Sequence, residues 1–200
     1  LPPPSWDLRE SLNLKPRVRA LCFKQALFFS RSFSPGSRKL NPKLRVRQSL
    51  PNLSKIRAFF FDAGGTLFRP YPSVGEIYAE VARPYGVTAD PQKLEALFHT
   101  IWEKRDGLAS LARRSGQKEE KAWWRSLVGE VFSQFGRMEN FEAFFDELYD
   151  RFASPDAWRL FDDTLPLLQE LKERGKILGI VSNWDSRLFG LCEGLALGPY

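Results

Sequence analysis

Residues 56–67 of this chain read Ile-Arg-Ala-Phe-Phe-Phe-Asp-Ala-Gly-Gly-Thr-Leu. The first six residues form a short, mostly apolar run, which predicts a strand buried on both faces of a parallel sheet. The run stops at Asp62, and the glycines at 64 and 65 permit a tight turn whose backbone can approach a ligand closely. Because ligands bind at the carboxyl ends of parallel strands, we expect chemistry at Asp62 and Thr66.

A second strand is predicted over residues 176–181, and it ends at Ser182 and Asn183. A predicted helix over 164–174 precedes it and another over 185–195 follows, an order typical of a doubly wound α/β sheet. A carboxylate at one strand end can act as a nucleophile or Mg²⁺ ligand, and hydroxyl and backbone N–H groups at the other can hold a phosphate. The structural alternative is that the carboxylate belongs to an ordinary turn and the serine caps a helix.

Four helices are predicted between the two strands. A capping box over residues 73–76 opens the first, and Asp90-Pro91 opens the second. All four carry apolar and aromatic residues at helical spacing, which is more typical of the core of a small bundle than of a ligand platform. His99, the only histidine, falls beside the apolar stripe of the second helix, so we expect a surface residue rather than a catalytic one.

The charge of the chain is divided between its ends. The 200 residues carry a net charge of +6, but residues 1–57 carry +11 and residues 58–200 carry −5. The basic part is rich in Ser and Pro, so we expect a disordered extension over residues 1–55. Its alternatives are an organelle transit peptide, translated sequence upstream of a true start near Leu53, and a nucleic-acid-binding arm. No recognisable nucleic-acid-binding module interleaves basic and aromatic residues there, so no nucleic-acid partner is expected.

The composition argues against several classes of protein. Two cysteines, Cys22 and Cys192, cannot build a disulfide framework or a Cys-based zinc site, and a single histidine argues against a Ser-His-Asp triad. The longest apolar runs are far too short to span a bilayer. We therefore expect a cytoplasmic α/β protein, or a mitochondrial or plastid one if residues 1–55 are a transit peptide.

The two strand ends resemble the motifs of a known family. Residues 61–67, Phe-Asp-Ala-Gly-Gly-Thr-Leu, resemble the first motif of the haloacid dehalogenase-like (HAD) hydrolases, and residues 180–185, Ile-Val-Ser-Asn-Trp-Asp, resemble the second. The helical stretch between them looks like the four-helix cap of subfamily IA. The resemblance covers residues 56–200 and implies an incomplete Rossmann-like core with an inserted helical cap. The implied division is core over 56–70 and 159–200, and cap over 71–158.

The resemblance also implies a role for each motif residue. Asp62 would be the nucleophile that forms an aspartyl-phosphate and, with the backbone carbonyl of Gly64, a ligand of Mg²⁺. Thr66 would steady the loop, while Ser182 and the backbone of Asn183 would bind the transferring phosphoryl oxygens. The implied activity is Mg²⁺-dependent hydrolysis of a phosphate ester, with a small phosphorylated metabolite or a similar small molecule as the partner.

Two departures from the family pattern leave this activity open. Family phosphatases have a general-acid Asp two positions after the nucleophile, where this sequence has Gly64, and losing such a proton donor costs about 10²–10⁴-fold in rate. The third-motif Lys and the fourth-motif acidic pair have no counterpart before Tyr200, so we expect an N-terminal fragment that is weak or inactive alone. The alternatives are a non-catalytic HAD-like binding protein and a dehalogenase- or phosphonatase-type hydrolase, because those enzymes also lack that Asp.

Overall fold

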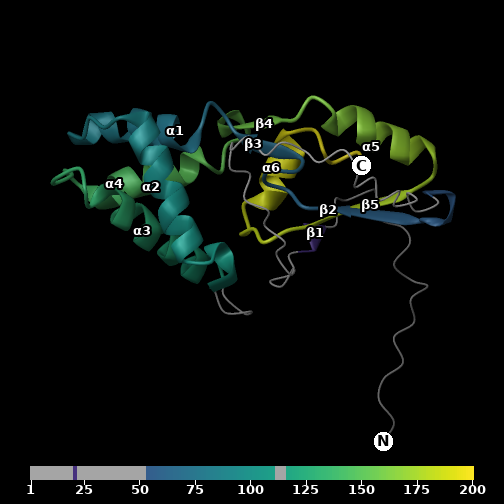
Figure 1. The fold of residues 1–200 in the computed structure, drawn as a ribbon, viewed down its shortest axis with the longest axis horizontal. Helices are drawn as coiled ribbons and strands as arrows, with labels where there is room; N and C mark the ends of the chain where they lie inside the picture. The colour runs from purple at the N-terminus through teal and green to yellow at the C-terminus, as the bar shows by residue number, and fades with distance from the viewer. Residues whose placement is uncertain (1–19, 22–52, 111–115) are drawn as a thin grey trace, which may run out of the picture.

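The structure is a computed structural model that describes residues 20–21, 53–110 and 116–200. Its elements form two groups, a parallel sheet with two helices and a separate group of four helices (Figure 1). The extension predicted over residues 1–55 lies mostly outside the described residues.

The larger sheet has three parallel strands in the order β1-β5-β2. These are β1 (Ala20–Leu21), β2 (Ala58–Phe61) and β5 (Ile177–Val181). The pairing of β2 with β5 sets Phe61 beside Ile180, so the two strands run level and end at the same edge of the sheet. The parallel sheet with its helices confirms the predicted α/β fold class.

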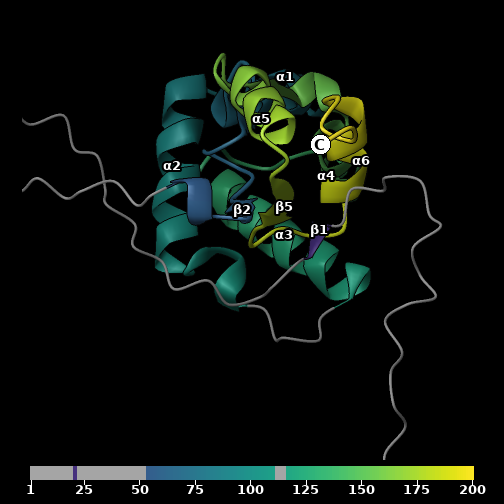
Figure 2. The same cartoon turned by 90° about the vertical axis from the view of Figure 1, so that its right-hand side faces the viewer.

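Helices α5 (Thr164–Glu173) and α6 (Leu188–Gly194) cover one face of this sheet (Figures 1 and 2). Apolar residues from the strands, the helices and the loop after β2 form the buried core of this part. Its buried members are Ala63, Leu67, Phe68, Leu168, Ile180, Leu188, Cys192 and Leu197.

The opposite face of the sheet remains open among the described residues. Phe60 is 62% exposed and Ile177 is 65% exposed, and both point away from the buried face because side chains alternate along a strand. The exposure of Phe60 contradicts the prediction that the first strand is buried on both faces, since α5 and α6 are the described helices that cover the sheet and they lie on one face.

A short antiparallel ribbon, which the sequence did not predict, joins the two parts of the chain. It pairs β3 (Phe68–Pro70) with β4 (Trp158–Leu160), and Phe68 lies opposite Leu160. Residues 71–157 lie between these two strands in sequence, and we call them the helical insert.

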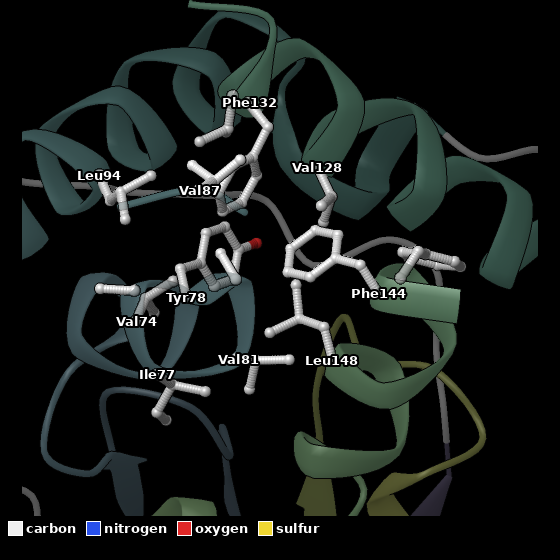
Figure 3. Close-up of a cluster of buried hydrophobic side chains, with 14 of the residues drawn as sticks. Val74, Ile77, Tyr78, Val81, Val87, Leu94, Val128, Phe132, Phe144 and Leu148 are labelled. Atoms are coloured by element: carbon white, nitrogen blue, oxygen red, sulfur yellow. The ribbon is translucent and has the colours of Figure 1, made fainter. Parts of the chain in front are cut away.

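The helical insert contains four α-helices around a core of its own. Their bounds are α1 (Val74–Ala82), α2 (Pro91–Lys104), α3 (Gln117–Phe132) and α4 (Phe141–Arg151). Figure 3 shows how apolar side chains from all four helices converge on Tyr78, whose burial raises the pKa of its hydroxyl. No helix in the described ranges is long and apolar enough to cross a membrane.

Local signals explain where these helices begin. Ser73 Oγ accepts a 3.1 Å hydrogen bond from the backbone N–H of Glu76 and donates one of 2.9 Å to the Glu76 carboxylate, which stabilises the first turn of α1. Asp90 caps α2 by accepting the backbone N–H of Gln92 at 3.1 Å. His99 is exposed on α2 beside Glu95 at 3.1 Å, in agreement with its prediction as a surface residue.

Candidate active site

Asp62 and Ser182 follow the neighbouring strands β2 and β5 at one edge of the sheet. Asp62 is exposed, and its carboxylate makes no hydrogen bond or ion pair with any described residue. Ser182 is only 4% exposed, yet its hydroxyl also bonds to no residue in the described part of the chain. The structure thus brings together an accessible carboxylate and a hydroxyl from segments 120 residues apart, and neither group is occupied by a residue that the structure describes.

Backbone hydrogen bonds fix the loop that follows β2. The carbonyl of Ala63 accepts N–H bonds from Thr66, Leu67 and Phe68, at 3.2, 2.8 and 3.3 Å. Gly65 lies at φ 77°, in the left-handed region where glycine is favoured. Thr66 therefore takes part in the turn through its backbone, and a role for its hydroxyl stays a prediction.

A buried threonine anchors the far end of this loop. Thr164, the first residue of α5, donates its hydroxyl to the carbonyl of Leu67 at 2.8 Å, and the backbone N–H of Phe161 donates to the same oxygen at 3.1 Å. The sequence marked Thr164 only as part of a helix start. Its contact with a loop 97 residues away has no local sequence signal, so sequence reasoning missed this positioning residue.

The loop after β5 lays an indole ring against the loop after β2. A Cβ atom placed on Gly64 would lie 2.5 Å from Cζ3 of Trp184, well inside van der Waals contact. The same ring meets Phe68 edge-on at 5.3 Å between centroids and Trp158 at 5.1 Å. Trp184 therefore fills the space that a side chain at position 64 would need, a relationship that sequence reasoning also missed.

Asp185 ties the loop after β5 to the helical insert. It is 1% exposed, and its carboxylate accepts hydrogen bonds from Nε of Arg187 at 2.9 Å and from the indole N–H of Trp124 on α3 at 2.8 Å. Arg187 also donates to the carbonyl of Tyr149 on α4 at 3.2 Å and lies 4.0 Å from that ring, whose burial raises the pKa of the Tyr149 hydroxyl. One acidic residue thus connects the sheet edge with two helices of the insert.

This network also changes where the last helix begins. The sequence predicted a helix over 185–195, but α6 starts at Leu188. The Asp185 carboxylate accepts the backbone N–H of Arg187 at 3.0 Å, which holds residues 185–187 in a turn ahead of the helix.

The two predicted Mg²⁺ ligands lie in the loop that follows β2. The Asp62 carboxylate and the Gly64 carbonyl both accept no hydrogen bond from a described residue. Both are oxygen donors, the type that Mg²⁺ prefers. The described residues contain no cluster of three or more His, Cys, Asp or Glu that could hold a metal. Two oxygen donors on one loop are compatible with Mg²⁺ but do not make a metal site by themselves, so Mg²⁺ binding at Asp62 and Gly64 stays a prediction.

Comparisons with known proteins agree with this arrangement. The model of the haloacid dehalogenase-like hydrolase family matches residues 56–198, and the chain belongs to this family. This confirms the family that the two motifs predicted.

Two vertebrate haloacid dehalogenase-like proteins are similar to this chain. The chain is 30% identical over 146 residues, 72% of its length, to the human haloacid dehalogenase-like hydrolase domain-containing protein 3, and 29% identical over 144 residues, 71% of its length, to the zebrafish (Danio rerio) protein of that name. It spans 58% and 60% of the length of these two relatives.

A solved structure supports the fold. A crystal structure described as that of a dehalogenase matches with a TM-score of 0.53 and 20% identity, over 72% of this chain and 59% of that one. At this level of identity the likeness shows a shared fold, in agreement with the predicted Rossmann-like HAD core.

Proposed function

We propose that the full-length protein hydrolyses small phosphate esters through a covalent aspartyl-phosphate at Asp62. The observation that carries this proposal is the position of Asp62 at the end of β2, where it is exposed and bonds to no described residue, beside Ser182 at the end of β5. Membership of a hydrolase family supports the reaction class. Carboxylates at such positions serve as nucleophiles in covalent catalysis.

The residues would divide the work of two displacement steps. A carboxylate oxygen of Asp62 attacks phosphorus, and the bond from phosphorus to the leaving oxygen breaks with its electron pair on that oxygen. The Ser182 hydroxyl and the backbone N–H of Asn183 donate hydrogen bonds to the phosphoryl oxygens as charge builds up. Water then attacks the aspartyl-phosphate, which restores Asp62 and releases inorganic phosphate.

Asp62 and the Gly64 carbonyl would hold Mg²⁺ in this site. When bound, the ion supplies positive charge that offsets the repulsion between the Asp62 carboxylate and the phosphoryl group. The fixed turn around Ala63 keeps both oxygen donors on one short loop, so the chain arranges them before a ligand arrives.

The helical insert would act as a cap over the site. The contacts that support this are those of Asp185 and Arg187, because they join the loop after β5 to α3 and α4. A cap joined to the loop that carries Ser182 would favour small substrates, since it would limit the space at this edge of the sheet.

The test is a phosphatase assay on the full-length protein with a panel of small phosphate esters. We expect phosphate release that requires Mg²⁺, stops on chelation and disappears in Asp62→Asn. The matched control, Asp156→Asn, changes another exposed acid outside the two loops and should keep the wild-type rate. Phosphate release by Asp62→Asn at the wild-type rate would contradict the proposal.

Gly64 favours a second candidate, a hydrolase that breaks a carbon–halogen bond. Halide leaves as a stable anion, so this reaction needs no general acid at position 64. In that case the full-length protein would release halide from a haloacid without Mg²⁺ and would release no phosphate from the esters. If it releases neither, the remaining reading is a non-catalytic HAD-like binding protein.

A further inference from the structure

We infer that Trp184 keeps position 64 free of a side chain, and that the enzyme therefore acts on phosphoryl donors whose leaving group departs as a stable anion, such as aryl and acyl phosphates. The substrate class rests on the proposed function, while the exclusion of a side chain rests on the geometry alone. This inference makes Trp184 a specificity-determining residue.

The Trp184 ring lies directly beside Gly64. The 2.5 Å between a Cβ on Gly64 and Cζ3 of Trp184 is shorter than real Cβ contacts, so any residue other than glycine must displace the ring. The ring is not the loose end of a flexible side chain, because Phe68 and Trp158 pack against it. Phe68 is itself fully buried, so moving Trp184 disturbs the core of the sheet.

Another candidate proton donor lies on the two loops. Asp185 is the acid nearest to Trp184 in sequence, but its carboxylate accepts N–H bonds from Arg187 and Trp124. Both oxygens of this buried carboxylate are therefore occupied by N–H donors. Position 64 is therefore the remaining place on these loops for a general acid. The Trp184 ring occupies the space that such a side chain would need.

When Asp62 attacks phosphorus, the leaving oxygen keeps the electron pair of the broken bond. Without a proton donor at position 64, this oxygen departs as an anion and takes its proton from water afterwards. A general acid typically raises the reaction rate about 10²–10⁴-fold. Its absence slows the hydrolysis of alkyl esters, because the alkoxide that leaves from them is a strong base. Aryl and acyl phosphates escape it because their anions are weak bases.

The first experiment uses the wild-type full-length protein and a leaving-group series. Its kcat/KM is measured with Mg²⁺ on 4-nitrophenyl, phenyl and benzyl phosphate, and Asp62→Asn gives the background. We expect kcat/KM to fall at least about 100-fold from the nitrophenyl to the benzyl ester. Asp62-dependent turnover of both esters at similar rates would overturn the substrate class and leave the proposed function standing.

The second experiment tests the exclusion by Trp184. Gly64→Asp alone should not speed up benzyl phosphate hydrolysis, whereas Gly64→Asp with Trp184→Ala should raise it at least about 10-fold relative to Trp184→Ala. A gain by Gly64→Asp alone would overturn the exclusion, because the acid would then fit beside the intact ring.

A double-mutant cycle measured by melting temperature tests the contact between Gly64 and Trp184 without any activity assay. Gly64→Ala should lower the melting temperature of the wild type by about 3–10 °C, and should lower that of Trp184→Leu much less. Equal losses in both backgrounds would overturn the exclusion. If the wild type hydrolyses no ester, the proposed function and the substrate class fail together, and this cycle still decides whether Trp184 excludes a side chain at position 64.

Discussion

The indole N–H of Trp124 on α3 donates a 2.8 Å hydrogen bond to the buried carboxylate of Asp185, in the loop that follows β5. The two residues are 61 positions apart in sequence and belong to the helical insert and to the edge of the sheet. Arg187 donates hydrogen bonds to both oxygens of the same carboxylate. A polar link therefore joins the insert to the loop that carries Ser182 and Trp184.

Replacing Trp124 by Phe should weaken this link. The substitution keeps an aromatic ring but removes the donor to Asp185, and a hydrogen bond to a charged group is worth about 1.5–3 kcal/mol. We expect the free energy of unfolding, measured by urea titration, to fall by about that amount. The control is Trp102→Phe, because the Trp102 indole N–H donates to no described residue. Equal losses in the two variants would show that ring size and not the hydrogen bond matters.

Replacing Thr164 by Val should loosen the loop after β2. Valine has nearly the same shape but lacks the hydroxyl that donates to the Leu67 carbonyl, and the loss costs about 0.5–1.5 kcal/mol because this carbonyl keeps the N–H of Phe161. We expect a lower free energy of unfolding in urea and a lower kcat for the Asp62-dependent reaction. Thr164→Ser keeps the hydroxyl, so it should keep most of the free energy of unfolding and most of kcat. A valine variant as stable and as active as the serine variant would show that the Thr164 hydroxyl does not hold the loop in place.

Stability at acid pH should report the contact between α2 and α3. Hydrogen bonds from Arg105 hold the pKa of Glu130 below its usual range. This contribution is present above the usual glutamate pKa and is lost as the pH falls through the lowered value. Arg105→Gln should therefore lower the free energy of unfolding by up to about 1 kcal/mol at neutral pH, and the difference should vanish on acidification.

Urea titrations between pH 7 and pH 3 would measure this difference. The control is Lys104→Gln, which removes a longer and more exposed ion pair with Glu130, at 3.5 Å. This variant should lower the free energy of unfolding by less than Arg105→Gln does. A difference that is constant across the pH range would show that Arg105 acts through packing and not through its charge.

Local sequence signals predicted much of this fold. The capping box at Ser73 and the Asp90-Pro91 pair mark helix starts because each acts within four residues of itself. The apolar runs that precede Asp62 and Ser182 predicted two parallel strands and placed these residues at one edge. The β3–β4 ribbon was missed, since each strand has only three residues and pairs with a segment 90 residues away.

The parts of the site that were missed depend on contacts between distant segments. Neither the sequence around Gly64 nor that around Trp184 shows that a ring fills the space beside the glycine. The same holds for Asp185, which reads as the start of a helix but lies buried between Arg187 and Trp124. Sequence patterns give the elements and the residues at their ends, whereas these side-chain contacts arise only when the elements pack.

Capture of the covalent intermediate is the most direct test of Asp62 as the nucleophile. The full-length protein would be mixed with 4-nitrophenyl phosphate and Mg²⁺, quenched in acid within one turnover, and digested for mass spectrometry. We predict a phosphoryl group on the peptide that contains Asp62, and none on that peptide from Asp62→Asn. Turnover of the ester with no phosphoryl group on Asp62 at any quench time, or with the group on another residue, would contradict the account.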